Sequence, residues 1–144
     1  MPSLFFIFLL FISSLLCVFA KKQNVILFLV DDLGWSDLSL TGSKFYETPN
    51  IDRLAKEGVF FSDAYAASPV CSPTRASILT GKYPSRIKMT YISGTAGPKG
   101  PGYLLNAPNS AGNINPKDIT LAEALRSNGY KTVHIGKWHL QNHT

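Results

Sequence analysis

Residues 24–30 read as Asn followed by six apolar residues, Val-Ile-Leu-Phe-Leu-Val, and this run stops abruptly at Asp31 and Asp32. Such a run, bounded by turn-forming residues, is typical of a strand buried on both faces of a parallel sheet. Residues 59–65 and 130–135 predict two further strands. The chain is therefore expected to build a sheet with the two carboxylates at the end of its first strand.

Helical segments alternate with these strands. A Thr-Pro pair opens a predicted helix over residues 48–58, where Gly58 is expected to supply a left-handed stop. A second helix is predicted over residues 72–81, and a third over residues 120–129 begins with a Thr-x-x-Glu capping box. This alternation predicts an α/β fold, a mostly parallel sheet flanked by helices.

A long loop separates the second and third helices. Of the 27 residues from 92 to 118, 15 are Gly, Pro, Asn or Ser, so no long regular element is expected there. Loops of this length are uncommon in compact domains, and most are lids, binding segments or insertions.

The first 20 residues resemble a secretory signal peptide, with 16 apolar residues and no charge before Lys21. An uncleaved anchor is the alternative, because the usual positive start is missing. Cleavage after Ala20 would leave residues 21–144 as the mature domain, without stable membrane association, and Cys71 as its one thiol. That thiol cannot form an internal disulfide, so it is intermolecular, a buried hydrophobe or chemically special.

The net charge of +5 comes from 14 basic and 9 acidic side chains. The basic residues are spread along the chain rather than gathered into one stripe with interleaved aromatics, so nucleic-acid binding is not expected. An excess of positive charge does suit an anionic substrate.

Ligands of open α/β sheets gather beyond the carboxyl ends of the strands. Three groups of residues follow such ends: Asp31 with Asp32, Cys71 with Arg75, and Lys137 with His139.

Asp31 and Asp32 offer hard oxygen ligands suited to calcium or magnesium, or form a solvated turn. Both can reach one ion only if the backbone turns, which Gly34 would permit. Cys71 lies at the start of a helix with Arg75 one turn on, where an anion would be stabilised. A phosphatase-type thiolate is disfavoured, because that motif needs an arginine where Ser77 stands.

Cys-Ser-Pro-Thr-Arg followed by Ala-Ser-Ile-Leu-Thr-Gly, residues 71–81, resembles the signature of the type I sulfatases. Residues 24–34 and Gly-Lys-Trp-His-Leu at 136–140 also resemble that family, in the same order. The resemblance implies an alkaline phosphatase-like α/β fold, and oxidation of Cys71 to formylglycine by the formylglycine-generating enzyme during secretion. It implies a sulfate-ester substrate and a lysosomal or extracellular location.

The resemblance also implies a role for each candidate residue. Formylglycine 71 would be the nucleophile and a metal ligand, and Arg75 would support its hydroxyls. Lys137 would bind sulfate oxygens, and His139 would take a proton from the diol. Asp31 and Asp32 would hold calcium, with magnesium the less favoured ion.

Type I sulfatases are considerably longer, so these residues resemble the N-terminal part of a catalytic domain. Alone they are expected to be marginally stable and inactive. Two alternatives stay open: a phosphate or phosphonate ester hydrolase of the same superfamily, and a non-catalytic secreted module in which Cys71 remains a thiol.

Overall fold

The computed structural model of this chain describes residues 21–95 and 97–141. It divides into two parts, Met1–Val30 and Asp31–Thr144, and each is described by itself. In the first part, residues 21–30 are exposed and form neither helix nor strand. The predicted signal peptide lies outside the described residues. Among those residues, none of the helices has the length and apolar character needed to span a bilayer.

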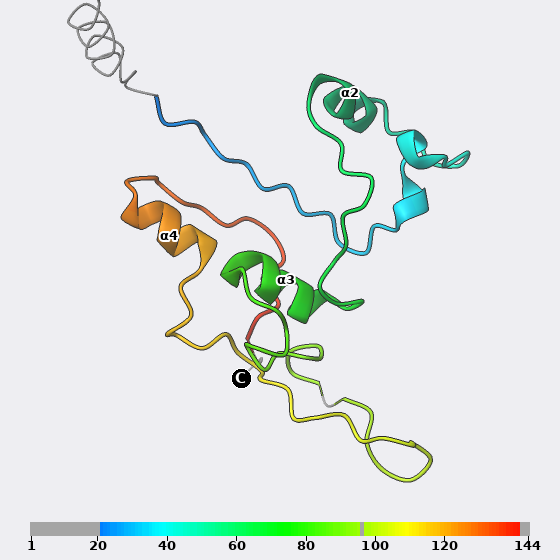
Figure 1. The fold of residues 1–144 in the computed structure, drawn as a ribbon, viewed down its shortest axis with the longest axis vertical. Coiled ribbons are helices and arrows are strands. Elements are labelled where there is room, and N and C mark those ends of the chain that lie inside the picture. The colour runs from blue at the N-terminus through cyan, green and yellow to red at the C-terminus, as the bar shows by residue number, and fades with distance from the viewer. Residues whose placement is uncertain (1–20, 96, 142–144) are drawn as a thin grey trace, which may run out of the picture. The chain divides into compact units, whose positions relative to one another are not determined.

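The described residues of the second part form three α-helices and two short 3-10 turns, whose arrangement Figure 1 shows. In chain order they are η1 (Trp35–Asp37), η2 (Ser39–Thr41), α2 (Pro49–Glu57), α3 (Cys71–Thr80) and α4 (Leu121–Ser127). The three predicted helices are therefore confirmed, within about two residues at each end.

The helix ends follow local chemistry, with one correction. At α3 the chain turns left-handed at Gly81 (φ 65°), whose N–H donates to the Ser77 carbonyl at 2.8 Å. Thr120 and Glu123 form the predicted capping box of α4. The left-handed stop predicted at Gly58 is wrong, because its φ is −118°, although its N–H still donates to the Leu54 carbonyl.

The described residues contain no strand, so the predicted parallel sheet stays a prediction. The segments expected to form it are solvent-exposed: Ile26 is 89% exposed, Val59 78% and Val133 84%. An apolar run becomes a strand only by pairing its backbone with a neighbour and burying its side chains. Among the described residues, these runs have no hydrogen-bonded neighbouring strand. Their apolar, strand-like sequence is therefore not sufficient to make them strands.

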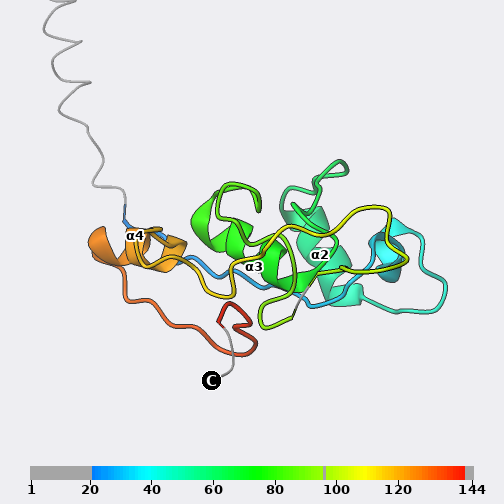
Figure 2. The ribbon, with the colours of Figure 1, turned by 90° about the horizontal axis from the view of Figure 1, so that it is seen from below.

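The buried core is small and centred on α3. Ala76, Met89 and Leu140 are fully buried, and Leu79, Ile87 and Ile114 pack against them. Helix α4 contacts α3 (Figure 2). At its described positions, the segment 92–118 has neither helix nor strand, as predicted. The core therefore joins α3 to the segment before the long loop, to Ile114 within the loop and to the segment around Leu140.

Candidate active site

Cys71 is the first residue of α3, so its side chain lies where free backbone N–H groups favour negative charge. Its thiol is partly exposed and forms no disulfide. The preceding residue, Val70, is extended, and Pro73 in the first turn is compatible with a helix start. The local sequence thus places the sulfur at the open end of a helix.

His139 comes from 68 positions further along the chain and meets this sulfur. Its Nδ1 lies 3.3 Å from the Cys71 Sγ. His139 has a left-handed backbone (φ 57°), which is uncommon for a residue other than glycine. The next residue, Leu140, is buried, and its carbonyl accepts the Ile114 N–H at 3.3 Å. Burial of Leu140 therefore anchors the turn that presents His139.

Asp31 binds two cationic side chains. Its Oδ1 accepts from the Arg75 Nη2 at 2.7 Å, and its Oδ2 accepts from the Lys137 Nζ at 2.6 Å. Arg75 also donates from Nη1 to the Lys137 carbonyl at 2.8 Å. One guanidinium thus joins the turn at Asp31 to the segment that carries Lys137.

These contacts shift the ionisation of both partners of the ion pair. Hydrogen bonds from Lys137 and then Arg75 lower the pKa of Asp31 below its ordinary value of 3.8. The hydrogen bond to Asp31 raises the pKa of Lys137 above 10.5. Arg75 is only 8% exposed, and its Nε has no hydrogen-bond partner among the described residues. A charge this buried needs a counter-charge, which Asp31 provides.

Asp32 is exposed and has a left-handed backbone (φ 54°). The turn that the sequence required between the two carboxylates is therefore made at Asp32 itself. Gly34, predicted to permit it, has an ordinary φ of −81° and donates its N–H to the Asp37 carboxylate at 2.7 Å. Gly34 serves that close approach, since a Cβ there would lie 2.8 Å from the Asp37 Oδ2.

The donor chemistry at this turn fits a hard divalent cation in part. Asp31 and Asp32 supply carboxylate oxygens, the preferred ligands of calcium. Within the described ranges, however, no group of three His, Cys, Asp or Glu side chains is placed to hold a metal ion. These residues fit one side of a coordination shell rather than a whole one.

The structure thus forms two contacting groups, Cys71 with His139 and Asp31 with Arg75 and Lys137. The chain links them, because Arg75 lies one helical turn after Cys71 and Lys137 lies two residues before His139. These five residues are called the residue-71 cluster below. Asp32 adjoins it through the chain. Sequence reasoning missed Ser72 and Ser93, which are 0% and 4% exposed and hydrogen-bonded to each other. No sequence signal marks a buried serine, because serine is mostly a surface residue.

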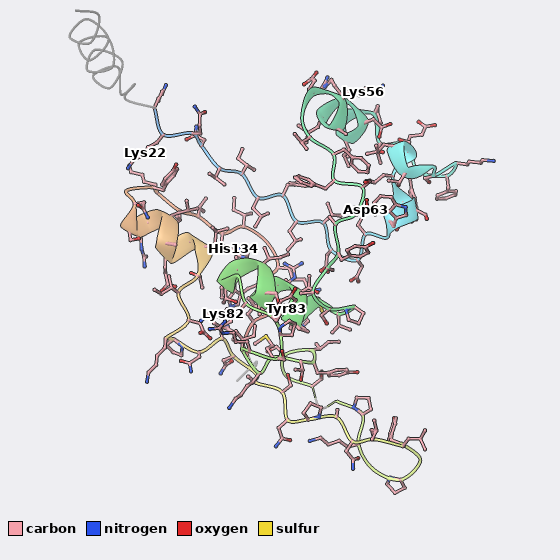
Figure 3. The ribbon with its side chains drawn as sticks, viewed as in Figure 1. Lys22, Lys56, Asp63, Lys82, Tyr83 and His134 are labelled. Atoms are coloured by element: carbon pink, nitrogen blue, oxygen red, sulfur yellow. The ribbon has the colours of Figure 1, made fainter. Side chains whose placement is uncertain are left out.

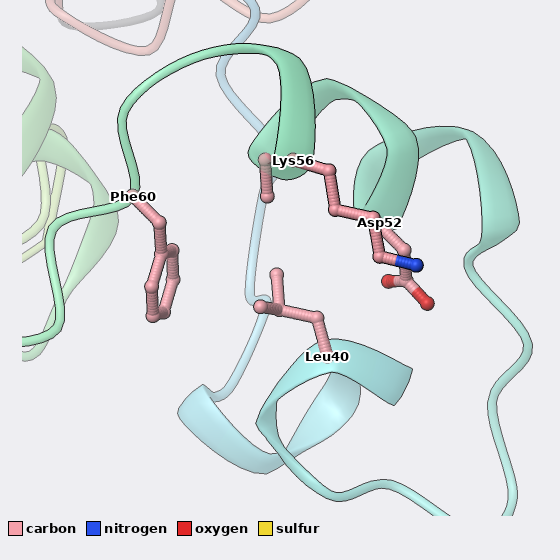
Figure 4. Close-up of a pocket in the computed structure, with 5 residues that line it drawn as sticks. Leu40, Asp52, Lys56 and Phe60 are labelled. Carbon is pink, nitrogen blue, oxygen red and sulfur yellow. The ribbon is translucent and has the colours of Figure 1, made fainter.

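Other polar features lie outside the cluster. His134, labelled in Figure 3, is exposed and packs edge-on against Trp138. Lys82, also labelled there, follows α3 and forms an ion pair with Asp118 at 2.5 Å. A hollow of about 360 Å³ lies between η2 and α2, where Leu40 and Phe60 face the space (Figure 4). None of the candidate site residues lines it.

Comparison with known proteins points to one family. A family model described as Sulfatase matches residues 23–144. Steryl-sulfatase of Mus musculus is 46% identical over 120 residues, covering 83% of this chain and 18% of that protein. Steryl-sulfatase of Homo sapiens is 45% identical over 121 residues, covering 84% and 20%. N-acetylgalactosamine-6-sulfatase of Sus scrofa is 43% identical over 120 residues, covering 83% and 22%.

The chain is also similar to solved structures. The crystal structure of Ps i-CgsB matches with a TM-score of 0.70 at 38% identity, covering 85% of this chain and 25% of that one. Its complex with k-i-k-neocarrahexaose matches with a TM-score of 0.64 at 37% identity, covering 78% and 22%. The chain spans about a fifth of the length of the curated relatives that it matches.

Proposed function

The chain belongs to the sulfatase family, and on that premise we propose that it forms the N-terminal part of a catalytic domain that hydrolyses sulfate esters. The observation that carries the proposal is the residue-71 cluster. Hydrolysis of an anionic ester needs a nucleophile, a proton acceptor and fixed positive charge in one place. Cys71, His139 and the two cations Arg75 and Lys137 supply these groups from two distant stretches of sequence, residues 71–75 and 137–139.

The proposal includes conversion of Cys71 to formylglycine. A hydrated aldehyde at position 71 supplies a hydroxyl that can attack sulfur and a second hydroxyl through which sulfate can leave. His139 Nδ1 lies within hydrogen-bond reach of the position-71 side chain, so its imidazole can take a proton from the group there. The partial exposure of Cys71 leaves room for an ester to approach.

Lys137 and Arg75 divide the handling of negative charge. Lys137 is 39% exposed, and its ammonium has three donors, of which the contact with Asp31 uses one. The others can bind sulfate oxygens. Arg75 is buried, and its two terminal nitrogens donate to Asp31 and to the Lys137 carbonyl. Its role is therefore to orient Asp31 and Lys137. A buried fork of this kind holds geometry better than a flexible ammonium does.

The proposed metal site uses Asp31, Asp32 and the converted residue 71. A calcium ion there, with magnesium as the alternative, would withdraw charge from the sulfate oxygens. Arg75 and Lys137 fix the orientation of the Asp31 carboxylate, while the turn at Asp32 sets the direction of the second one. The remaining ligands would come from beyond these residues.

The proposed compartment and fold follow from the same premise. Conversion of Cys71 by the formylglycine-generating enzyme would occur in the secretory pathway, which agrees with the apolar start of the chain and with a lysosomal or extracellular destination. Within the complete catalytic domain, the exposed runs at residues 24–30, 59–65 and 130–135 would pair as strands of the parallel sheet. Pairing would bury the apolar side chains that are exposed here.

The proposed substrate class is the sulfate ester, since the relatives carry the names of different sulfatases. The test compares 4-nitrophenyl sulfate and 4-nitrophenyl phosphate with the complete protein secreted from eukaryotic cells. We expect kcat/KM for the sulfate to be higher by about 100-fold or more. A preference for the phosphate would instead establish a phosphate ester hydrolase, and turnover of neither ester would leave a non-catalytic module.

A further inference from the structure

Ser72 is fully buried directly beside Cys71, and its hydroxyl is occupied. The Ser72 Oγ accepts the backbone N–H of Ser93 at 2.9 Å. Ser93 in turn donates from its own hydroxyl to the carbonyl of Gly112. Two serines thus connect the first turn of α3 to the two limbs of the long loop, defined here as residues 88–93, which enter the loop, and residues 110–112.

The same limbs are joined at further points. Ser110 Oγ accepts the N–H groups of Thr90 and Tyr91 at 3.1 and 3.0 Å, and the Ala111 N–H donates to the Lys88 carbonyl at 2.6 Å. Residues 88–93 and 110–112 therefore form one unit. The hydrogen bond between Ser93 and Ser72 joins this unit to the end of α3 that carries Cys71.

We propose that Ser72 is a positioning residue: its buried hydroxyl sets the paired limbs of the loop beside residue 71, so that the loop forms a wall of the ester-binding site. This inference rests on the proposed sulfatase function. In the contacts described, Ser72 is hydrogen-bonded neither to His139, which contacts the Cys71 sulfur, nor to Asp31. Ser72 therefore acts through Ser93. A wall held at a fixed distance contributes equally to binding of substrate and transition state.

The chain offers a matched control on the same helix. The hydroxyl of Ser77 is also buried, yet it has no hydrogen-bond partner among the described residues. Ser72→Ala removes a hydroxyl that holds the loop, whereas Ser77→Ala removes one that holds nothing. Ser93→Ala breaks only the next link, to Gly112, and leaves the Ser72 acceptor in place.

The first measurement is hydrogen exchange of the complete protein. Removing the acceptor of a buried N–H should speed exchange of the Ser93 amide in Ser72→Ala by about tenfold or more. Exchange in residues 110–112 should rise as well, and Ser77→Ala should match the parent. Equal exchange in Ser72→Ala and Ser77→Ala would overturn the proposal.

The second measurement separates positioning from plain stability. With 4-nitrophenyl sulfate, and rates expressed per mole of formylglycine, Ser72→Ala and Ser93→Ala should raise KM roughly fivefold while kcat stays within about twofold, the pattern of lost uniform binding. The double variant should be no worse than Ser72→Ala, because both changes break one chain of contacts. Unchanged KM beside faster exchange would make Ser72 a structural residue only and overturn the proposal.

The two failures are distinguishable. If the parent protein turns over no sulfate ester, the proposed function falls, and the role of the loop in substrate binding falls with it. If the parent is active and Ser72→Ala behaves as Ser77→Ala does in both measurements, the sulfatase function stands and the positioning role fails.

Discussion

Asp31 and Asp52 are both held by hydrogen bonds, but their partners differ in kind and in distance along the chain. Asp52 accepts from two neutral hydroxyls, Ser39 at 2.8 Å and Thr48 at 3.0 Å, within 13 positions. Asp31 accepts from two cations, Arg75 and Lys137, that lie 44 and 106 positions away. The carboxylate beside the hollow of Figure 4 thus belongs to a local network, and the carboxylate of the residue-71 cluster to a long-range one.

This difference separates local structure from a site. Ser39, Thr48 and Asp52 join η2 to the start of α2, and these three side chains include no cation that could attract an anionic ester. The residue-71 cluster gathers two cations around one carboxylate, so Arg75, Lys137 and Asp31 together carry one net positive charge. Positive charge that the fold does not neutralise is available to an anionic ester.

The largest effect is expected at Cys71. Cys71→Ala should lower hydrolysis of 4-nitrophenyl sulfate by at least about 1,000-fold, because no other side chain in the cluster can replace the nucleophile. The unfolding temperature should change little, since the one side-chain contact described for the sulfur is with His139. Activity within tenfold of the parent would remove Cys71 from the chemistry.

The second largest loss of activity is expected when the Asp31 carboxylate is removed, and removal of the Asp52 carboxylate is the comparison. Asp31→Asn should lower kcat/KM by roughly 100-fold, because it frees Lys137 and leaves the buried Arg75 without its counter-charge. Asp52→Asn, the matched control, should change kcat/KM by less than about twofold while lowering the unfolding temperature. Equal losses of activity in the two variants would mean that the residue-71 cluster has no special role.

Features of the fold that depend on local interactions could be predicted from the sequence, and those that depend on distant partners could not. The helices were predictable because their start and stop signals, such as the capping box of Thr120 and Glu123, act within one turn. The sheet was not established, because the run at residues 24–30 needs pairing partners that its own sequence cannot name.

For the site, the sequence supplied the residue types and the structure supplied the contacts. Motifs placed Cys71 and Arg75 at a helix start and His139 beyond a predicted strand, but spacing cannot show that His139 Nδ1 faces the sulfur. The hydrogen bond from Arg75 to the Lys137 carbonyl could not be predicted from the sequence either, because every residue type has a backbone carbonyl.

A smaller effect concerns the pH response of the local network. The hydrogen bond from Ser39 lowers the pKa of Asp52 below its ordinary value of 3.8. A depressed carboxyl pKa contributes stability that is present above pH 3.8 and is lost as the pH falls through the depressed value. Ser39→Ala should therefore move the pKa of Asp52 upward toward 3.8, as followed by NMR titration of its carboxyl carbon.

Ser43→Ala is the control for this titration, since Ser43 accepts from the amides of Phe45 and Tyr46 and does not contact Asp52 in the bonds described. It should leave the Asp52 titration where it is in the parent. An Asp52 pKa that is unmoved in Ser39→Ala would show that the hydroxyl network does not stabilise the carboxylate.

The smallest effect is expected at α4. Thr120→Ala removes the side chain that accepts the Glu123 N–H at 3.3 Å, and loss of such a cap costs about 1 kcal/mol of unfolding free energy. Thr120→Ser should restore most of it in denaturant titrations, and kcat/KM should be unchanged in both variants. A loss of activity in Thr120→Ala would extend the site to α4, contrary to this account.

The mass of the peptide containing residue 71, measured on the complete protein secreted from eukaryotic cells, tests the central claim most directly. The account predicts that the peptide has lost its sulfur through conversion of the thiol to an aldehyde, and that hydrolysis of 4-nitrophenyl sulfate rises in proportion to the converted fraction. An intact thiol at residue 71 in a protein that hydrolyses the ester at full rate would contradict it.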